Sequence, residues 1–227
     1  NHPSFTTLLP PACKRPVSFE THLPPHRSDT KGAALETFIV TPGDPGRIEV
    51  EHFIRKTYRD EYGAVLSEFP ALIMAAFNGH GQIAAAAGIR SEADGFFSEA
   101  YLDHPIEALL TALCDSKVER REIFEVTSLA SREPRKTAAF IDAIVRYGML
   151  HGFQWSFFTL TLRLRQLLDR LGLDLAFLGS ADRFRIRNHQ SWGTYYAAEP
   201  GVFAIRSPAR SKDLSTVCKR ATHAEAA

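Results

Sequence analysis

Two short, strongly apolar segments flank a longer amphipathic one in the middle of the chain. Residues 123–129 (IFEVTSL) and 153–161 (FQWSFFTLT) are rich in β-branched and aromatic residues, as strands are. Between them, residues 134–150 carry apolar side chains at helical spacing, and His151-Gly152 follows as a helix stop. A strand, a helix and a strand of these lengths predict a parallel pair joined by a right-handed crossover. Because helices cover a parallel sheet, this unit predicts the α/β class.

The flanking segments extend this unit into one mixed sheet. Asn78-Gly79-His80-Gly81 is a strong hairpin turn between two strand-like runs. Further strands are expected at 35–41, 71–77, 83–90, 175–178, 183–187, 193–197 and 202–206, and residues 96–102 also read as sheet. Further helices are expected at 47–62, 105–113 and 162–171. The sequence therefore predicts a mixed, twisted sheet with helices on both faces.

The two ends of the chain differ from this core in composition. Residues 1–34 are rich in Pro, Ser, Thr and His, which predicts an extended or disordered N-terminal arm. Residues 207–227 are small, polar and charged, which predicts a flexible C-terminal tail. One domain over residues 35–206 remains. In a chain of 227 residues that are 44% hydrophobic, such a domain can bury a sizeable core.

Charge and cysteine content exclude several classes of protein. A net charge of +1 gives no global reason to bind nucleic acid or an anionic membrane. Arg183, Arg185 and Arg187 form the only tight basic cluster, and on a strand they would share one face, either solvated or an anion site. Three widely separated cysteines predict neither a disulfide framework nor a metal site, and favour a cytoplasmic location. No apolar run is long enough to span a membrane, and the start lacks the apolar region of a signal peptide.

A polar loop joins the strand at 123–129 to the helix that begins near Pro134. Free backbone N–H groups and the positive end of the helix dipole meet at such a junction, which makes it an anion site. Its polar side chains are Arg132, Arg135, Lys136 and Thr137. The sequence is compatible with a site for the phosphates of a pantetheine carrier, or with an ordinary turn bearing exposed basic residues. The loop lacks the glycine spacing of nucleotide-binding fingerprints.

Glu125 is the one acid within an otherwise apolar strand. A buried carboxylate is costly unless it is paired or its pKa rises. With a raised pKa, Glu125 could take a proton from an attacking ammonium group. Equally, it could form a structural ion pair with Arg90 or another cation. No Ser-His-Asp order or nucleophile elbow occurs, which disfavours a covalent acyl-enzyme.

Several stretches, in the same order, resemble the thermostable hemolysin family. They are YRDEYGA (58–64), AAAAGIRSE (84–92), SEAYLDHPIE (98–107), FEVTSLAS (124–131), LRQLLDRLGL (164–173) and WGTYY (192–196). The order of elements is similar to the GNAT acyltransferase superfamily, in which an acyl thioester docks between two splayed central strands. The resemblance covers about residues 47–205 and implies a GNAT-like fold. A family name is a label rather than a mechanism.

That family is in turn similar to acyl-homoserine lactone synthases. Arg90 in AGIRSE and Glu125 in FEVTS match, in context, an arginine and a glutamate that those synthases use. Ser128 stands where the synthases have an arginine, and their early paired aspartates have no counterpart. These departures argue against S-adenosylmethionine as the acceptor.

The resemblance implies an N-acyltransferase that moves an acyl group directly from acyl-CoA or acyl carrier protein to a small amine. Glu125 would be the base or orient the acceptor, Arg90 would bind an anionic group on it, and Tyr195, on a strand with Tyr196 facing the other way, would protonate the leaving thiolate. The donor would be held by the backbone of Thr127, Ser128 and Leu129 and by the loop residues Arg132, Arg135, Lys136 and Thr137. No permanent cofactor and no metal are expected, and an apolar sheet edge allows a homodimer.

Three other functions are alternatives for the same sequence. One is S-adenosylmethionine-dependent lactone synthesis, which predicts release of methylthioadenosine. The chain could be a non-catalytic binding module with this fold, which the loss of the synthase arginine at Ser128 favours. It could also lyse membranes directly, and the apolar segments 96–102 and 153–160 would then have to insert.

Overall fold

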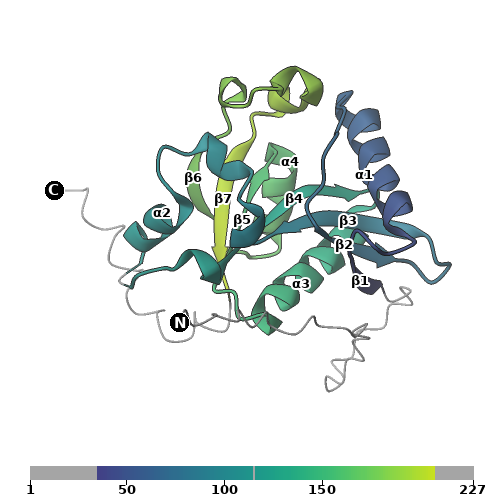
Figure 1. Ribbon diagram of the computed structural model, residues 1–227, viewed down its shortest axis with the longest axis horizontal. Helices are drawn as coiled ribbons and strands as arrows, with labels where there is room; N and C mark the ends of the chain where they lie inside the picture. Colours follow the sequence, from purple (N-terminus) through teal and green to yellow (C-terminus); the bar gives the residue numbers. More distant parts are fainter. Residues whose placement is uncertain (1–34, 115, 208–227) are drawn as a thin grey trace, which may run out of the picture. The chain divides into compact units, whose positions relative to one another are not determined.

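The computed structural model describes residues 35–114 and 116–207, with the side chains of Pro134 and Arg135 outside the description. The predicted arm at 1–34 and the predicted tail, apart from Ser207, lie outside these residues. The strands are β1 Glu36–Val40, β2 Leu72–Phe77, β3 Ile83–Arg90, β4 Ile123–Ser131, β5 Trp155–Leu160, β6 Ala176–Ser180 and β7 Gly201–Arg206. The α-helices are α1 Arg47–Tyr62, α2 Ile106–Ala112, α3 Pro134–Leu150 and α4 Leu162–Arg170 (Figure 1).

The described strands form one mixed sheet in the order β1-β2-β3-β4-β5-β7-β6. Strands β1 to β4 are antiparallel neighbours, β4 and β5 are parallel, and β7 lies antiparallel between β5 and β6. The expected parallel pair is therefore present at the centre of the sheet. The sheet twists strongly, so that β2–β4 run nearly across Figure 1 whereas β7 runs nearly upright.

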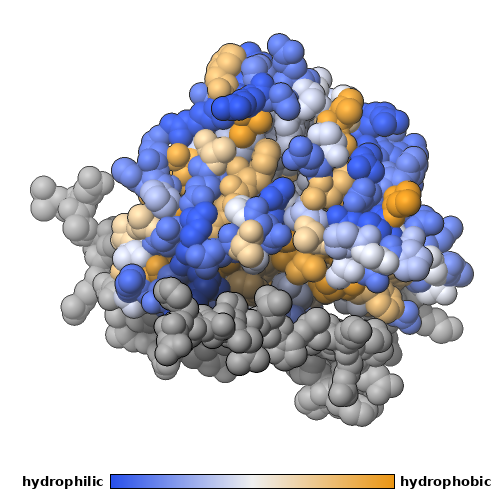
Figure 2. All heavy atoms as spheres, in the orientation of Figure 1, coloured by the Kyte–Doolittle hydropathy of each residue, from blue (hydrophilic) through white to orange (hydrophobic). Residues whose placement is uncertain are grey.

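Helices cover both faces of the sheet, as the sequence predicts. Alternate strand residues such as Met74, Ile89 and Phe158 pack with the apolar stripes of α3 and α4. On the opposite face, α1 packs on the β1–β4 half, and α2 with the segment around Tyr101 packs on the β5–β7 half. Figure 2 shows hydrophilic side chains over much of the surface in this view, with apolar ones gathered near its middle.

Three segments that read as strands form 3₁₀ helices instead. They are η2 Ser98–Tyr101, η4 Arg183–Arg185 and η6 Tyr195–Ala198, and another 3₁₀ helix, η5 His189–Trp192, lies between the last two. Local hydrogen bonds outweigh strand propensity here, since the Asp182 side chain accepts the N–H of Phe184 and so begins η4. The prediction that Arg183, Arg185 and Arg187 share one strand face is therefore wrong.

The segments proposed for membrane insertion belong to the folded core. Phe96 and Tyr101 are buried, and β5 lies in the middle of the sheet. Within the described residues, the model has no helix with the length and apolar character needed to cross a bilayer. Insertion of either segment would require dismantling the sheet.

Candidate functional site

The two parallel strands at the centre of the sheet pair over only four residues. Residues 123–126 of β4 lie beside residues 155–158 of β5, and the pairing goes no further. β4 then bulges, because Ser128 and Leu129 both stand opposite Ala87 of β3, and Ser128 adopts a φ of 50°. The strands therefore part in the middle of the sheet, at the place where the family resemblance predicts an opening.

Gly88 on β3 allows this bulge to lie close to the loop before β2. A Cβ atom on Gly88 would lie 2.5 Å from Thr127 Oγ1 and 2.6 Å from Pro70 Cγ, which is too close for any side chain. Thr127 Oγ1 is buried and has no hydrogen-bond partner among the described residues. Because Thr127 lines the cavity at this opening, a bound molecule with a hydrogen-bonding group could satisfy its hydroxyl.

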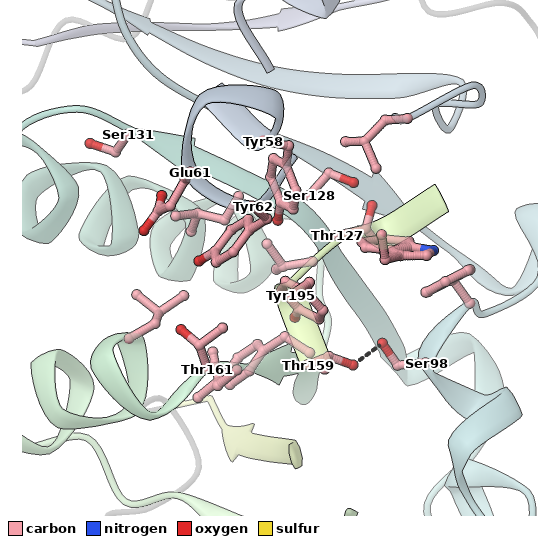
Figure 3. A pocket seen from close by; sticks show the side chains of 18 of the residues that line it. Tyr58, Glu61, Tyr62, Ser98, Thr127, Ser128, Ser131, Thr159, Thr161 and Tyr195 are labelled. Carbon is pink, nitrogen blue, oxygen red and sulfur yellow. Dashed lines mark hydrogen bonds between the residues drawn. The ribbon is translucent and has the colours of Figure 1, made fainter. Parts of the chain in front are cut away.

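A cavity of about 480 Å³ lies across the opening, with lining residues from both faces of the sheet. The wall toward α3 and α4 is apolar and includes Val126, Ile141, Ile144, Phe158, Leu164 and Leu168. The opposite wall is rich in hydroxyl groups and includes Tyr58, Tyr62, Ser98, Thr127, Thr159 and Tyr195 (Figure 3). Such a cavity suits a ligand with an apolar chain and a polar head.

Glu125 is completely buried beside this opening. Its two carboxylate oxygens accept the backbone N–H groups of Phe97 and Ser98, at 2.6 and 2.7 Å. Burial raises the pKa of Glu125 to about 7, although these hydrogen bonds and the positive charge of Arg90 oppose the rise. Glu125 is not among the residues that line the cavity. Its carboxyl therefore lies behind the wall, and its role as the base stays a prediction.

Arg90 lies directly across from Glu125 on the neighbouring strand, which puts both side chains on one face. Within the described residues, its guanidinium makes two long hydrogen bonds, both of 3.4 Å from Nη1, to the carbonyls of Asp94 and Gly95. Its Nε is buried and has no partner among the described residues. Arg90 also lines the cavity, so a guanidinium with a buried, unpartnered Nε among the described residues faces this space.

Tyr195 lines the cavity from η6 rather than from a strand. It is buried among Tyr58, Tyr62 and Trp192, with ring centroids 5.2–6.3 Å away. Burial raises the pKa of Tyr195, so its phenol keeps its proton at neutral pH. Tyr196, on the same 3₁₀ helix, does not line the cavity, but its hydroxyl bonds at 2.7 Å that of Tyr101, which does.

The proposed phosphate loop is only partly open to a ligand. Arg132 and Thr137 line the cavity together with Ser131. The Thr137 hydroxyl bonds Ser131 Oγ at 2.7 Å and the carbonyl of Glu133 at 3.0 Å. Lys136 is paired with Glu133 at 2.6 Å and does not line the cavity, whereas the side chain of Arg135 lies outside the described part.

Several lining residues carry no sequence signal. Arg163 and Arg170 reach the cavity from α4. Of the basic cluster noted in the sequence, Arg187 also lines the cavity, whereas Arg183 and Arg185 do not. Ser98 and Thr159 meet across 61 positions of sequence, with 2.8 Å between their hydroxyl oxygens. Hydroxyl and arginine side chains are common on protein surfaces, so these residues are identified only by their position in the folded structure.

The segment 189–196 closes the cavity against the end of α1, and Gly193 makes this contact feasible. Its φ of 54° and ψ of −124° suit glycine, and a Cβ would overlap the carbonyl oxygen of Tyr62. We expect Gly193→Ala to lower the free energy of unfolding by about 1–3 kcal/mol. It should also speed hydrogen exchange at the Thr194 N–H, which bonds Tyr62 O at 2.8 Å.

The matched control is Gly43→Ala, because Gly43 has nothing within 4 Å of an added Cβ and no positive φ. Its effect should stay within about 0.5 kcal/mol. Equal unfolding midpoints for the two variants in urea would contradict the role assigned to Gly193.

Among the described residues, no group of three or more His, Cys, Asp or Glu side chains could hold a metal ion. The site thus consists of an opening in the sheet, an apolar wall, a hydroxyl-rich wall, and Arg90 with buried Glu125 behind it.

Comparison with solved structures gives the same fold. The acyl-homoserine lactone synthase LasI superposes with a TM-score of 0.52 at 15% identity, over 77% of this chain and 91% of LasI. FeeM, an N-acyl amino acid synthase from uncultured soil microbes, gives 0.51 at 14% identity, over 77% and 93%. A putative N-acetyltransferase from Lactobacillus plantarum gives 0.50 at 8% identity, over 77% and 99%. The described chain therefore has a GNAT-like fold.

At the level of sequence, no curated protein matches this chain. The family model described as "Thermostable hemolysin" matches residues 40–210, which include all the elements from α1 to β7. The resemblance drawn from the short stretches is thus confirmed over most of the chain. The chain belongs to the thermostable hemolysin family.

Proposed function

We propose that the chain is an N-acyltransferase that moves an acyl group from a pantetheine thioester, acyl-CoA or acyl carrier protein, to a small amine. The observation that carries the proposal is the parting of β4 and β5 beyond Val126 and Phe158, with a cavity across the gap. A thioester carrier that adds to the free edge of β4 would meet the backbone of Thr127, Ser128 and Leu129. The solved relatives include an acyl-homoserine lactone synthase and an N-acyl amino acid synthase, in line with acyl transfer.

The two walls of the cavity suit the two halves of this reaction. The apolar wall toward α3 and α4 suits an acyl chain, and Arg132 with the start of α3 suits the phosphates of the donor. Arg90 has spare donors for an anionic group on the acceptor. Tyr195 lines the cavity and carries its proton at neutral pH, so its hydroxyl can donate to the leaving thiolate. Most of the catalysis would come from positioning the two substrates.

Donor binding can be tested with decanoyl-CoA and a pair of variants on α4. Leu164 lines the cavity, whereas Leu162 on the same helix is 54% exposed and does not. Leu164→Trp should fill part of the acyl space and raise the Kd for decanoyl-CoA at least about tenfold, or 1.4 kcal/mol. Leu162→Trp should leave the Kd unchanged in isothermal calorimetry. If the wild-type chain binds no acyl-CoA and no acyl carrier protein, the proposal is wrong.

The acceptor is best identified by native mass spectrometry of the protein as expressed. A co-purified acyl-pantetheine or acylated amine would give the length of the acyl chain and the class of the amine. Ser128 in place of the synthase arginine argues against S-adenosylmethionine, so no methylthioadenosine should be released when it is added.

A non-catalytic binding module is the second candidate, and Ser128 is the observation that favours it. Such a module would bind acyl-CoA in the calorimetric experiment but release no free thiol with any amine.

A further inference from the structure

The buried carboxyl of Glu125 cannot touch an acceptor in the cavity. It is fully buried, it is not part of the cavity wall, and both of its oxygens are occupied by the N–H groups of Phe97 and Ser98. A general base must lie within hydrogen-bond reach of the proton that it takes, or be linked to it by a bridging group. If Glu125 takes part in acyl transfer, something must carry the proton through the wall.

Two hydroxyl groups occupy that place in the wall. Ser98 Oγ and Thr159 Oγ1 are 2.8 Å apart, and either atom can be the donor (Figure 3). Both residues line the cavity, although Ser98 is only 2% exposed. The Ser98 hydroxyl also lies close enough to the Glu125 carboxyl to help lower its pKa, and the backbone N–H of the same residue donates to Glu125 Oε1 at 2.7 Å. Ser98 and Thr159 therefore lie between the Glu125 carboxyl and the cavity.

The sheet explains why these two residues lie at the opening. Glu125 lies beside Phe157, and the parallel pairing ends at the next residue pair. Thr159 comes two positions after Phe157, so its side chain lies on the same face as that of Glu125. It is the first residue on that face beyond the end of the pairing, where a thioester would enter.

We propose that Ser98 and Thr159 form a hydroxyl relay that passes the acceptor's proton to Glu125, which acts as the base without touching the substrate. This inference rests on the proposed acyl transfer. It assigns Thr159 as the group that contacts the attacking amine and Ser98 as the link.

The relay balances in protons and electrons. The amine nitrogen attacks the thioester carbonyl carbon and forms the C–N bond. Its proton passes to Thr159 Oγ1, the Thr159 proton passes to Ser98 Oγ, and the Ser98 proton passes to the carboxylate. The C–S bond then breaks with its electron pair on sulfur, and the thiolate takes a proton from Tyr195. Glu125 later returns its proton to solvent by the same path, and Tyr195 regains one from solvent.

The electrostatic surroundings of Glu125 suit such a reversible acceptor. Burial raises the pKa of Glu125 to about 7, so the group can both take and release a proton near neutral pH. The other charged or titratable groups that act on it are Arg90 on β3 and Tyr101 on η2. Arg90 favours the ionised carboxylate, whereas burial raises the pKa of Tyr101 and keeps it neutral.

The test compares variants that remove one hydroxyl at a time. Ser98→Ala keeps the backbone N–H that Glu125 binds, and Thr159→Val is close to threonine in shape. With decanoyl-CoA and a panel of small amines, release of free thiol by each variant should fall about a hundredfold or more. The inflection near pH 7 in the wild-type rate should disappear. Thr159→Ser should restore both the rate and the inflection, and Ser180→Ala, at an exposed hydroxyl on β6 outside the cavity lining, should change neither.

The outcomes separate the two proposals. If the wild-type chain releases no thiol with any amine, acyl transfer is wrong and the relay is wrong with it. If the wild type turns over while both hydroxyl variants keep its rate and pH profile, the relay alone is overturned. If the variants do not fold, the wild-type rate measured in mixtures of H₂O and D₂O decides. Several protons in flight predict a curved dependence on the D₂O fraction, and a straight line contradicts the relay.

Discussion

Substitution of Arg47 by methionine is expected to lower the free energy of unfolding by about 3–5 kcal/mol, because it leaves a buried network without its donor. Arg47 Nη1 donates to the carbonyls of Val40 and Ala71, at 3.2 and 2.8 Å, and Nη2 donates to Pro70 O at 2.6 Å. Its Nε donates to Glu51 at 2.7 Å. Methionine fills similar space but satisfies none of these acceptors.

Urea unfolding of the wild type and variant measures this loss. Lys56→Met on the same helix is the control, because Lys56 is half exposed and pairs at the surface with Asp60, so that its loss should cost less than about 1 kcal/mol. Arg47 also holds the Pro70–Ala71 end of the loop that lines the cavity, so its loss should weaken decanoyl-CoA binding as well. Similar unfolding midpoints for the two variants would show that the hydrogen bonds of Arg47 do not contribute measurably to the free energy of unfolding.

At Arg47 the sequence predicts the local structure but not the burial of the side chain. The Pro-Gly turn before it and the apolar spacing after it predict the start of α1, and the structure confirms that start at Arg47. Its burial could not be predicted, because two of its carbonyl partners lie 23 and 24 positions away in sequence. A lone arginine at the start of a helix is ordinarily a solvated residue.

The central unit was predictable because local and tertiary preferences agree there. β4, α3 and β5 lie close to their predicted bounds, with Pro134 at the start of α3 and Gly152 just beyond its end. The stretch 183–198 was not predictable. Its arginines alternate with the spacing of a strand, but Arg185 instead donates hydrogen bonds to the carbonyl of Tyr101 and the carboxylate of Asp103. These bonds and the packing of Tyr195 depend on elements that are distant in sequence.

The site was predictable only in part, for a related reason. Glu125 stands out in sequence because an acid in an apolar strand requires an explanation, and the structure gives one in the N–H groups of Phe97 and Ser98. Arg90 was found through the resemblance rather than through physics. Ser98 and Thr159 were missed, since a single hydroxyl has no energetic signature in sequence until its partner is known.

Substitution of Glu125 by glutamine is expected to lower the rate of acyl transfer by about two to four orders of magnitude. The amide keeps the shape of the side chain but cannot accept the proton that arrives through Ser98. Thiol release from decanoyl-CoA in the presence of an active amine measures the effect. Full turnover by Glu125→Gln would show that the carboxyl is only a structural acceptor for the start of η2.

The same substitution should change how stability depends on pH. The folded chain binds the Glu125 proton more tightly than the unfolded chain, because burial raises the pKa from its ordinary 4.5 to about 7. The resulting stabilisation is complete below about pH 4.5 and is lost as the pH rises through about 7. The shift corresponds to about 3 kcal/mol, so the wild type should lose about that much relative to Glu125→Gln between pH 4.5 and pH 8.

Glu99, on the 3₁₀ helix η2, offers a control whose stability should depend on pH in the opposite direction. Its hydrogen bond with Arg120 lowers the pKa of Glu99, so its stabilisation is present above the ordinary pKa and is lost as the pH falls. Glu99→Gln should therefore lose stability mainly at neutral pH, whereas Glu125→Gln should gain relative to the wild type as the pH rises. Because Glu99 is the neighbour of Ser98, whose N–H donates to Glu125, the two acids share one region of the structure. Parallel pH dependences for the two variants would mean that burial does not control the proton on Glu125. Opposite dependences would identify Glu125 as a carboxyl that stores a proton near neutral pH, which is the property that a base behind the cavity wall needs.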